Sequence, residues 1–332
     1  MKRLLLLAAA ASVALGAGGD IPAPGNPPRD THGVDMRTQA GPPNGPGGPK
    51  YSPPFPVNPA LPDLWLIGDS TVRNGSLGDG TNLNQWGWGA PLTFYFDPAK
   101  VNVVNRALGG TSARSFYASQ WPKLVGLIKP GDVVIMQFGT NDGGRMEVGV
   151  GDLPGVGEET REVVNPRTHQ SATVHTYGWY LRRFIAETRE RGATPVVCSL
   201  IPRKSWGPDG RIRRTMDGFE GWAAQVARAE HVGFIDLNEL IARKLDALGR
   251  EKTDRIYVPN PTPERPRGET VHTGWDGAVL NAEVVVSGLK ALKDDPVVPR
   301  RRGFFGRCAA LLGVKSAGWF SPRAAAIAPA AP

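Results

Sequence analysis

The sequence predicts an α/β fold in which helices cover both faces of a central parallel sheet. Between residues 61 and 295, short apolar runs rich in β-branched residues alternate with longer amphipathic stretches. Runs that are nearly all apolar are typical of strands buried on both faces, as in a parallel sheet between helices. The chain has 332 residues, 40% of them hydrophobic, so it is long enough for one large domain with a sizeable core.

Five apolar runs are expected to form the strands, and the amphipathic stretches around them the helices. The expected strands are Leu64–Ile67, Val101–Val104, Val133–Phe138, Pro195–Leu200 and Phe234–Leu237. Helices are expected near residues 86–96, 113–128, 176–191, 218–231, 237–248 and 277–293. Sheets of this kind bind ligands at the carboxyl ends of their strands, so we expect the functional residues there.

The two ends of the chain depart from this pattern. Residues 1–17 combine a short basic start, an apolar run and small residues, which predicts a signal peptide and a secreted or periplasmic protein. Residues 18–60 contain 12 Pro and 8 Gly in 43 positions and are expected to form a disordered linker. Residues 296–332 carry six basic and no acidic side chains and are expected to form a poorly ordered tail.

Charge and residue spacing exclude several classes of protein. The formal net charge is +8, but residues 61–295 hold 28 basic and 28 acidic side chains, so the expected domain gives no support for nucleic-acid binding. Two widely separated cysteines exclude a disulfide-rich scaffold, and the five histidines lack metal-ligand spacing. No uncharged apolar run of 18 residues follows the N-terminus, so no integral membrane segment is expected in the mature chain.

Three expected strands end in residues suited to nucleophilic catalysis. The first is followed by Ser70, whose hydroxyl at a strand tip lies beside free backbone N–H groups, although Asp-Ser-Thr is also an ordinary helix N-cap. The second is followed by Gly109 and Gly110, which can offer an N–H group to a ligand or simply form a tight turn. The third is followed by Asn141, which suits either an oxyanion donor or an Asx-turn.

A candidate base precedes the last expected helix. Glu269 lies three residues before His272, so its carboxylate can orient the imidazole ring while the other ring nitrogen faces a serine. Among the remaining histidines, only His175, at the start of an expected helix, competes for this role.

Taken together, these segments resemble the SGNH, or GDSL-type, hydrolases, and most of all the rhamnogalacturonan acetylesterases. The resemblance covers roughly residues 61–293. It rests on the segments 68–71 (GDST), 104–115 (VNRALGGTSARS), 138–144 (FGTNDGG), 175–181 (HTYGWYL) and 272–278 (HTGWDGA). It implies a flavodoxin-like three-layer α/β/α sandwich that forms a single catalytic domain.

The resemblance also implies the roles of individual residues. Ser70 is the implied nucleophile and His272 the implied general base and then acid. The backbone N–H groups of Ser70 and Gly110 and the side-chain amide of Asn141 form the implied oxyanion hole. The family has Asp three residues before the histidine, where this chain has Glu269, and often His before the asparagine, where this chain has Thr140.

The implied activity is removal of O-acetyl groups from a plant-type polysaccharide, most of all rhamnogalacturonan. Alternatives are an esterase acting on acetylated xylan or small esters, and a carbohydrate-binding relative without turnover. We expect sugar contacts from Trp275, Trp206 and Arg114. Other residues suited to stacking on a sugar or pairing with a uronate are Trp86, Trp88, Arg73, Arg145 and Arg203. No metal or cofactor is expected, and the enzyme is expected to be a monomer.

Overall fold

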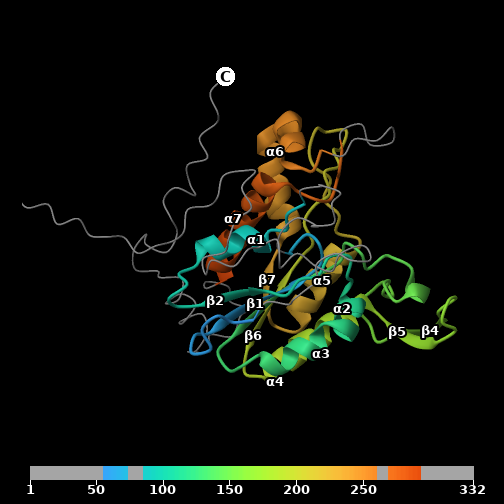
Figure 1. Ribbon diagram of the computed structural model, residues 1–332. Coiled ribbons are helices and arrows are strands. Elements are labelled where there is room, and N and C mark those ends of the chain that lie inside the picture. The colour runs from blue at the N-terminus through green and yellow to red at the C-terminus, as the bar shows by residue number, and fades with distance from the viewer. Residues whose placement is uncertain (1–54, 74–84, 260–267, 293–332) are drawn as a thin grey trace, which may run out of the picture.

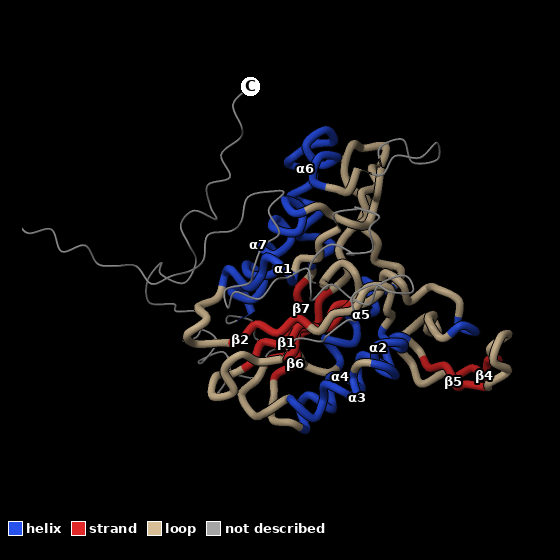
Figure 2. The backbone as a smooth tube through the Cα atoms, in the orientation of Figure 1, coloured by secondary structure: helices blue, strands red, loops and turns tan. Residues whose placement is uncertain are grey.

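The centre of the protein is a five-stranded parallel sheet (Figures 1 and 2). The structure, a computed structural model, describes residues 55–73, 85–259 and 268–292. The strands are β1 (Asp63–Gly68), β2 (Asn102–Asn105), β3 (Val133–Gln137), β6 (Thr194–Cys198) and β7 (Gly233–Ile235), in the order β2-β1-β3-β6-β7. All neighbouring strands in this sheet are parallel, which confirms the predicted fold class.

The strand order places a topological switch point between β1 and β3. The chain runs from β1 outward to β2, and then crosses back to form β3 on the other side of β1. The loops after β1 and β3 therefore diverge to opposite faces and leave a crevice at the carboxyl ends of these strands. Crevices of this kind are where open α/β sheets bind their ligands.

Side chains that alternate along each strand separate two hydrophobic layers. Leu64 and Leu66 of β1 pack on one face, whereas Trp65 and Ile67 pack on the other. The first face is covered by α1 (Gly89–Leu92), α6 (Leu237–Ile256) and α7 (Trp275–Ala291), and the second by α2 (Ala113–Ser119), α3 (Trp121–Leu124), α4 (Tyr177–Glu190) and α5 (Phe219–Ala229). The molecule is thus a three-layer sandwich.

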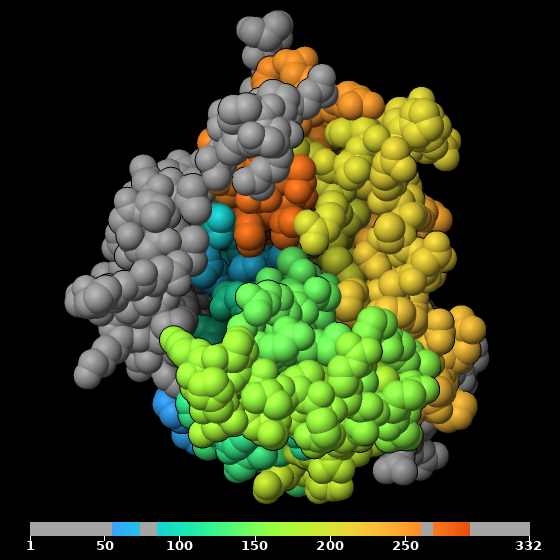
Figure 3. Space-filling model, turned by 90° about the vertical axis from the view of Figure 1, so that its right-hand side faces the viewer, coloured from blue at the N-terminus to red at the C-terminus, as the bar shows by residue number. Residues whose placement is uncertain are grey.

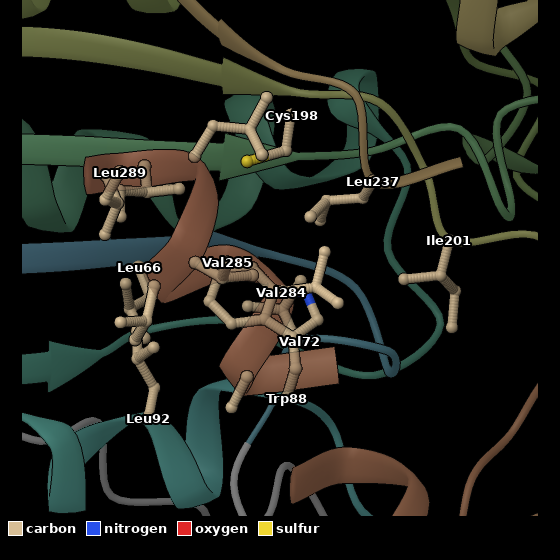
Figure 4. Packing of buried hydrophobic residues seen from close by; sticks show 14 of the residues in the cluster. Leu66, Val72, Trp88, Leu92, Cys198, Ile201, Leu237, Val284, Val285 and Leu289 are labelled. Carbon is tan, nitrogen blue, oxygen red and sulfur yellow. The ribbon is translucent and has the colours of Figure 1, made fainter. Parts of the chain in front are cut away.

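Figure 4 shows the packing of the first layer. Leu66 from the sheet lies near Leu92 of α1 and near Val285 and Leu289 of α7. Each of these side chains is less than 10% exposed, and full burial of such a side chain stabilises the fold by roughly 1.5–3 kcal/mol. Because both faces of the sheet are buried, the central residues of the strands are apolar.

Several element boundaries differ from those expected. The helix expected over 113–128 is divided into α2, α3 and the 3₁₀ turn η2 (Val125–Leu127), because Pro122 cannot donate a helical N–H and begins a new helix. The helix expected over 86–96 is the short α1 followed by the 3₁₀ turn η1 (Thr93–Tyr95). The fifth strand ends at Ile235, since Asp236 caps α6 by accepting a hydrogen bond from the Glu239 N–H.

An antiparallel hairpin that the sequence analysis did not predict projects from the domain at the right of Figure 1. It consists of β4 (Thr160–Val164) and β5 (Ser171–His175). Only Val163 and Val174 point inward, where they pack with Leu153. One buried side chain per strand is too weak a pattern to be recognised in the sequence.

The predictions for the chain ends stay predictions. The expected signal peptide, most of the expected linker and the expected tail lie outside the described residues. Among the helices that the structure describes, each is too short or too polar to cross a bilayer.

Candidate active site

Ser70 stands in a tight turn directly after β1. A side chain at Gly68 would place its Cβ 2.5 Å from the Gln137 carbonyl oxygen, so only glycine fits where β1 ends. The Asp69 side chain is fully buried and accepts hydrogen bonds from the backbone N–H and the hydroxyl of Thr71, both at 2.8 Å. These contacts fix the backbone on both sides of Ser70, which is itself 8% exposed.

A network of hydrogen bonds among buried polar side chains supports this turn. The Trp88 indole N–H donates to Gln137 Oε1 at 2.7 Å, and Gln137 Nε2 donates to Thr71 Oγ1 at 2.5 Å. Thr71 in turn donates to Asp69. All four side chains are at most 3% exposed, so each depends on its neighbours for hydrogen bonds. The network connects the Ser70 turn to the end of β3.

His272 faces Ser70, with 2.9 Å between the serine Oγ and the histidine Nε2. The loop that carries His272, residues 268–274 (the histidine loop), is held by hydrogen bonds to neighbouring segments. The Trp86 N–H donates to the Thr273 carbonyl at 2.9 Å, the Thr273 hydroxyl donates back to the Trp86 carbonyl at 2.9 Å, and the Val258 N–H donates to the His272 carbonyl at 3.1 Å. Of the two histidines considered as the base, His272 is thus the one in contact with Ser70. His175 ends β5 and stacks on Trp179.

Glu269 lies on the other side of the imidazole ring. Its Oε2 is 3.6 Å from His272 Nδ1, just beyond hydrogen-bond length. Its Oε1 accepts hydrogen bonds from the backbone N–H groups of Thr270 and Val271, at 2.7 and 3.1 Å. The carboxylate is therefore held in place by its own loop, from where it acts on the ring chiefly through its charge.

Burial lowers the pKa of His272 below its ordinary value of 6.5, and this effect outweighs the opposing effect of the Glu269 carboxylate. The positive charge of Arg73 contributes to the same lowering. The imidazole is consequently neutral at pH 7, and its Nε2 can accept the Ser70 proton.

The loops after β2 and β3 meet beside the serine. Gly110 has φ +78°, a conformation that favours glycine, and its backbone is exposed. Asn141 Nδ2 donates one hydrogen bond to the Thr111 carbonyl at 2.9 Å, which fixes the orientation of the amide and leaves its second N–H available. Within the described chain, the N–H groups of Ser70 and Gly110 have no acceptor.

A buried carboxyl pair stands behind Asn141. Asp142 accepts hydrogen bonds from the N–H groups of Ala113 and Gly139, both at 2.8 Å, and so ties the β3 loop to the start of α2. Burial raises the pKa of Asp142 to about 6, and burial together with the Asp142 charge raises the pKa of Asp152 well above its ordinary value. Spacing alone did not single out either residue in the sequence analysis.

The comparisons with known proteins agree with this geometry. Residues 66–272 match the model of the GDSL-like Lipase/Acylhydrolase family. The chain belongs to this family. Its members hydrolyse carboxylic esters, and this GDSL-like acylhydrolase is a carboxylic ester hydrolase, as its similarity to curated esterases also indicates.

Two curated relatives of this GDSL-like acylhydrolase carry a narrower name. A rhamnogalacturonan acetylesterase of Emericella nidulans is 31% identical over 253 residues, which cover 74% of this chain and 92% of that protein. The probable rhamnogalacturonan acetylesterase YesY of Bacillus subtilis is 28% identical over 230 residues, 69% of this chain and 93% of that protein. These relatives confirm the resemblance found in the sequence.

A solved structure, that of Bacillus subtilis YxiM, superimposes with a TM-score of 0.54 at 25% identity. The superposition covers 73% of this chain and 59% of that chain.

The residues expected to contact sugar are placed differently from Ser70 and His272. Trp275 of this acylhydrolase is 6% exposed, and its ring meets that of Trp86 edge-on at 5.0 Å. Arg114 is 8% exposed, and its Nη1 donates to the carbonyls of Met146 and Gly151. Trp206 is half-buried, with the Arg250 guanidinium 5.0 Å from its ring. These positions favour packing roles, and substrate contact by these residues stays a prediction.

The face that carries these loops is hollowed in Figure 3. There the early residues of the domain, in blue to teal, lie between the green segment after β3, the yellow segment after β6 and the orange segment before and within α7. A cavity of about 490 Å³ adjoins Asn141. Among the residues that the structure describes, no three His, Cys, Asp or Glu side chains are grouped as metal ligands.

Proposed function

We propose that the protein is a secreted serine acetylesterase that removes O-acetyl groups from rhamnogalacturonan through an acetyl-enzyme intermediate. The observation that carries the reaction type is the 2.9 Å contact between Ser70 Oγ and a neutral His272 Nε2 at the carboxyl end of β1. The similarity to rhamnogalacturonan acetylesterases supports the substrate, and the composition of residues 1–17 supports secretion.

In the first step, His272 Nε2 accepts the proton of the Ser70 hydroxyl as Oγ attacks the acetyl carbonyl carbon. The carbonyl oxygen becomes an oxyanion, which the N–H groups of Ser70 and Gly110 and the amide of Asn141 stabilise. Each such donor contributes roughly 10²–10³ in rate. Collapse of the intermediate releases the sugar hydroxyl, which takes the proton back from His272.

In the second step, water attacks the acetyl-Ser70 ester while His272 again accepts a proton, and acetate leaves with regeneration of the serine. Glu269 stabilises the imidazolium that forms in both steps, from 3.6 Å away. Neither step requires a group beyond the side chains and backbone N–H groups named here.

The test is acetate release by the purified chain from acetylated rhamnogalacturonan, acetylated xylan and p-nitrophenyl acetate. Ser70→Ala should abolish release, by roughly 10⁶ in kcat if it behaves like other triad serines. A matched control is Ser119→Ala, an exposed serine on α2 whose hydroxyl donates to the Ser115 carbonyl and accepts from Gln120 Nε2. It should retain full activity.

The substrates distinguish the proposal from its alternatives. Serine-dependent release that favours the pectic polymer supports it. Release that favours xylan or only the small ester assigns a broader esterase, and no serine-dependent release from any substrate contradicts the catalytic assignment and favours a carbohydrate-binding protein.

A further inference from the structure

The cavity beside Asn141 is built from three segments that meet at the carboxyl edge of the sheet. The loop after β3 contributes residues 139–141, 143, 144 and 150, the loop after β6 contributes Leu200 and Arg203, and the start of α5 contributes Phe219 and Glu220. Its volume of about 490 Å³ is within the range typical of small-ligand sites. Because Asn141 lines it, a group that enters this cavity lies next to the reacting ester.

The shape of the cavity suits a sugar ring. Gly143 and Gly144 leave one wall without side chains, and a Cβ at Gly143 would already touch the Phe219 ring at 3.5 Å. The Phe219 ring is held edge-on against Tyr177 at 5.1 Å and Trp222 at 5.0 Å. It therefore forms a fixed apolar surface of the kind on which the C–H face of a sugar packs.

Arg203 supplies the positive charge of the cavity. Its side chain is exposed, and no carboxylate of the described chain lies within ion-pair distance of its guanidinium. The other arginines considered near the strand ends are engaged by the protein itself. Arg114 binds two backbone carbonyls, Arg145 lies 4.0 Å from Glu147, and the buried Arg73 donates to Gln85.

The backbone around Arg203 is fixed relative to the catalytic histidine. The N–H of the next residue, Lys204, donates to the Thr270 carbonyl at 2.7 Å, within the segment that joins Glu269 to His272. Lys204 is 6% exposed and forms an ion pair with Asp254 at 2.9 Å. Arg203 thus stands between the histidine loop and the cavity, with a guanidinium that can pair with a carboxylate through two parallel hydrogen bonds.

The only acidic side chain lining the cavity within the described residues is Glu220, and it is partly engaged. Its Oε1 accepts a hydrogen bond from the Thr215 hydroxyl at 2.6 Å. A bound anion would consequently lie on the Arg203 side of the cavity and away from Glu220.

We propose that Arg203 is a specificity-determining residue that binds a uronate carboxylate of the acetylated polymer. The proposal rests on the proposed deacetylation at Ser70 and goes further, because it assigns the recognition of an acidic polymer to one side chain.

The experiment compares two forms of one substrate. Acetylated rhamnogalacturonan oligosaccharides are used as such and after reduction of their uronate carboxylates to primary alcohols, and the ratio of kcat/KM on the acidic form to that on the reduced form is measured. Arg203→Gln should lower this ratio about 5- to 10-fold, the range between an exposed ion pair and a charge-assisted hydrogen bond. Arg203→Lys, which keeps the charge but not the paired hydrogen bonds, should give an intermediate ratio.

The matched control is Arg228→Gln, which removes the same charge from an exposed arginine near the other end of α5. It should leave the ratio unchanged. A second readout needs no turnover. Calorimetry of the Ser70→Ala protein with tetragalacturonate should give a Kd that Arg203→Gln weakens by a similar factor and Arg228→Gln does not.

The two readouts separate the inference from the proposed function. If the wild-type chain releases no acetate from either oligosaccharide, the proposed function fails, and calorimetry alone then decides the role of Arg203. An unchanged ratio with an unchanged Kd, equal effects of Arg203→Gln and Arg228→Gln, or no binding of tetragalacturonate by the Ser70→Ala protein would each overturn the inference.

Discussion

Replacement of Glu269 by Gln tests how the catalytic histidine is assisted. The change removes the negative charge but keeps the length of the side chain and an oxygen that can accept from Thr270 and Val271. The loop should therefore keep its conformation. What is lost is the attraction between the carboxylate and the imidazolium that forms on His272 in the transition state.

The separation of 3.6 Å between Glu269 Oε2 and His272 Nδ1 sets the size of this attraction. The two side chains are 12% and 24% exposed. We bracket the effective dielectric constant between them by that of a protein surface, about 20, and that of bulk water, about 80. At 3.6 Å these limits give about 1 to 4.6 kcal/mol, a factor of roughly 5 to 2 × 10³ in kcat. A carboxylate hydrogen-bonded to the ring would be worth roughly 10⁴.

The assay is acetate release under saturating substrate by the wild type, Glu269→Gln and His272→Ala. His272→Ala should lose far more, roughly 10⁶ in kcat. The acid limb of the pH profile of Glu269→Gln should also move to lower pH, because the carboxylate raises the pKa of His272. Glu251→Gln, at an exposed position of α6, should change neither value. A loss in Glu269→Gln equal to that in His272→Ala would refute the reasoning.

Three further outcomes follow from the site. Asn141→Ala should lower kcat by roughly 10²–10³ with little change in KM, and a loss expressed only in KM would remove it from the oxyanion hole. The kcat/KM of the wild type should fall with decreasing pH around a midpoint below 6.5, since His272 must be neutral to act and burial lowers its pKa; a midpoint above 6.5 in the pH profile would contradict this. Gln137→Leu should lower the free energy of unfolding by about 2–4 kcal/mol, as measured by urea titration, because the buried Trp88 N–H loses its acceptor; a loss below 1 kcal/mol would show that the network can rearrange.

The strands and the contact between Ser70 and His272 were predictable because their signals are strong. Every strand of the main sheet is buried on both faces, so its central residues are apolar and appear as short runs such as Val133–Met136. Ser70 and His272 follow from their positions at a strand end and before the last helix. The structure places them in contact as that pattern required.

Other features depend on tertiary contacts that a sequence does not display. The β4–β5 hairpin has one buried side chain in each strand, so neither strand shows a clear period. The burial of Trp275 and Arg114 was not predictable, because a tryptophan or arginine near a strand end looks the same in the sequence whether it is exposed or packed. Their burial results from Trp86 and from the carbonyls of Met146 and Gly151, which lie far away in the chain.

Phe219 and Glu220 were not singled out in the sequence for a related reason. They begin an amphipathic helix, and nothing in that pattern distinguishes a residue that lines a cavity from one that faces solvent. Arg203 was among several arginines considered. The structure distinguishes it, because Arg73, Arg114 and Arg145 each contact another group of the protein.

Ser70 and His272, between which the proposed mechanism transfers a proton, are 202 positions apart, near the beginning and the end of the described domain. During synthesis Ser70 is among the first residues of the domain to be made, whereas His272 follows only after all five strands. A chain interrupted before residue 272 thus carries Ser70 without its proposed base. Ester hydrolysis will therefore appear only once the whole domain has folded. After dilution from urea, its recovery will report formation of the contact between Ser70 and His272, and it will follow any spectroscopic signal from the sheet.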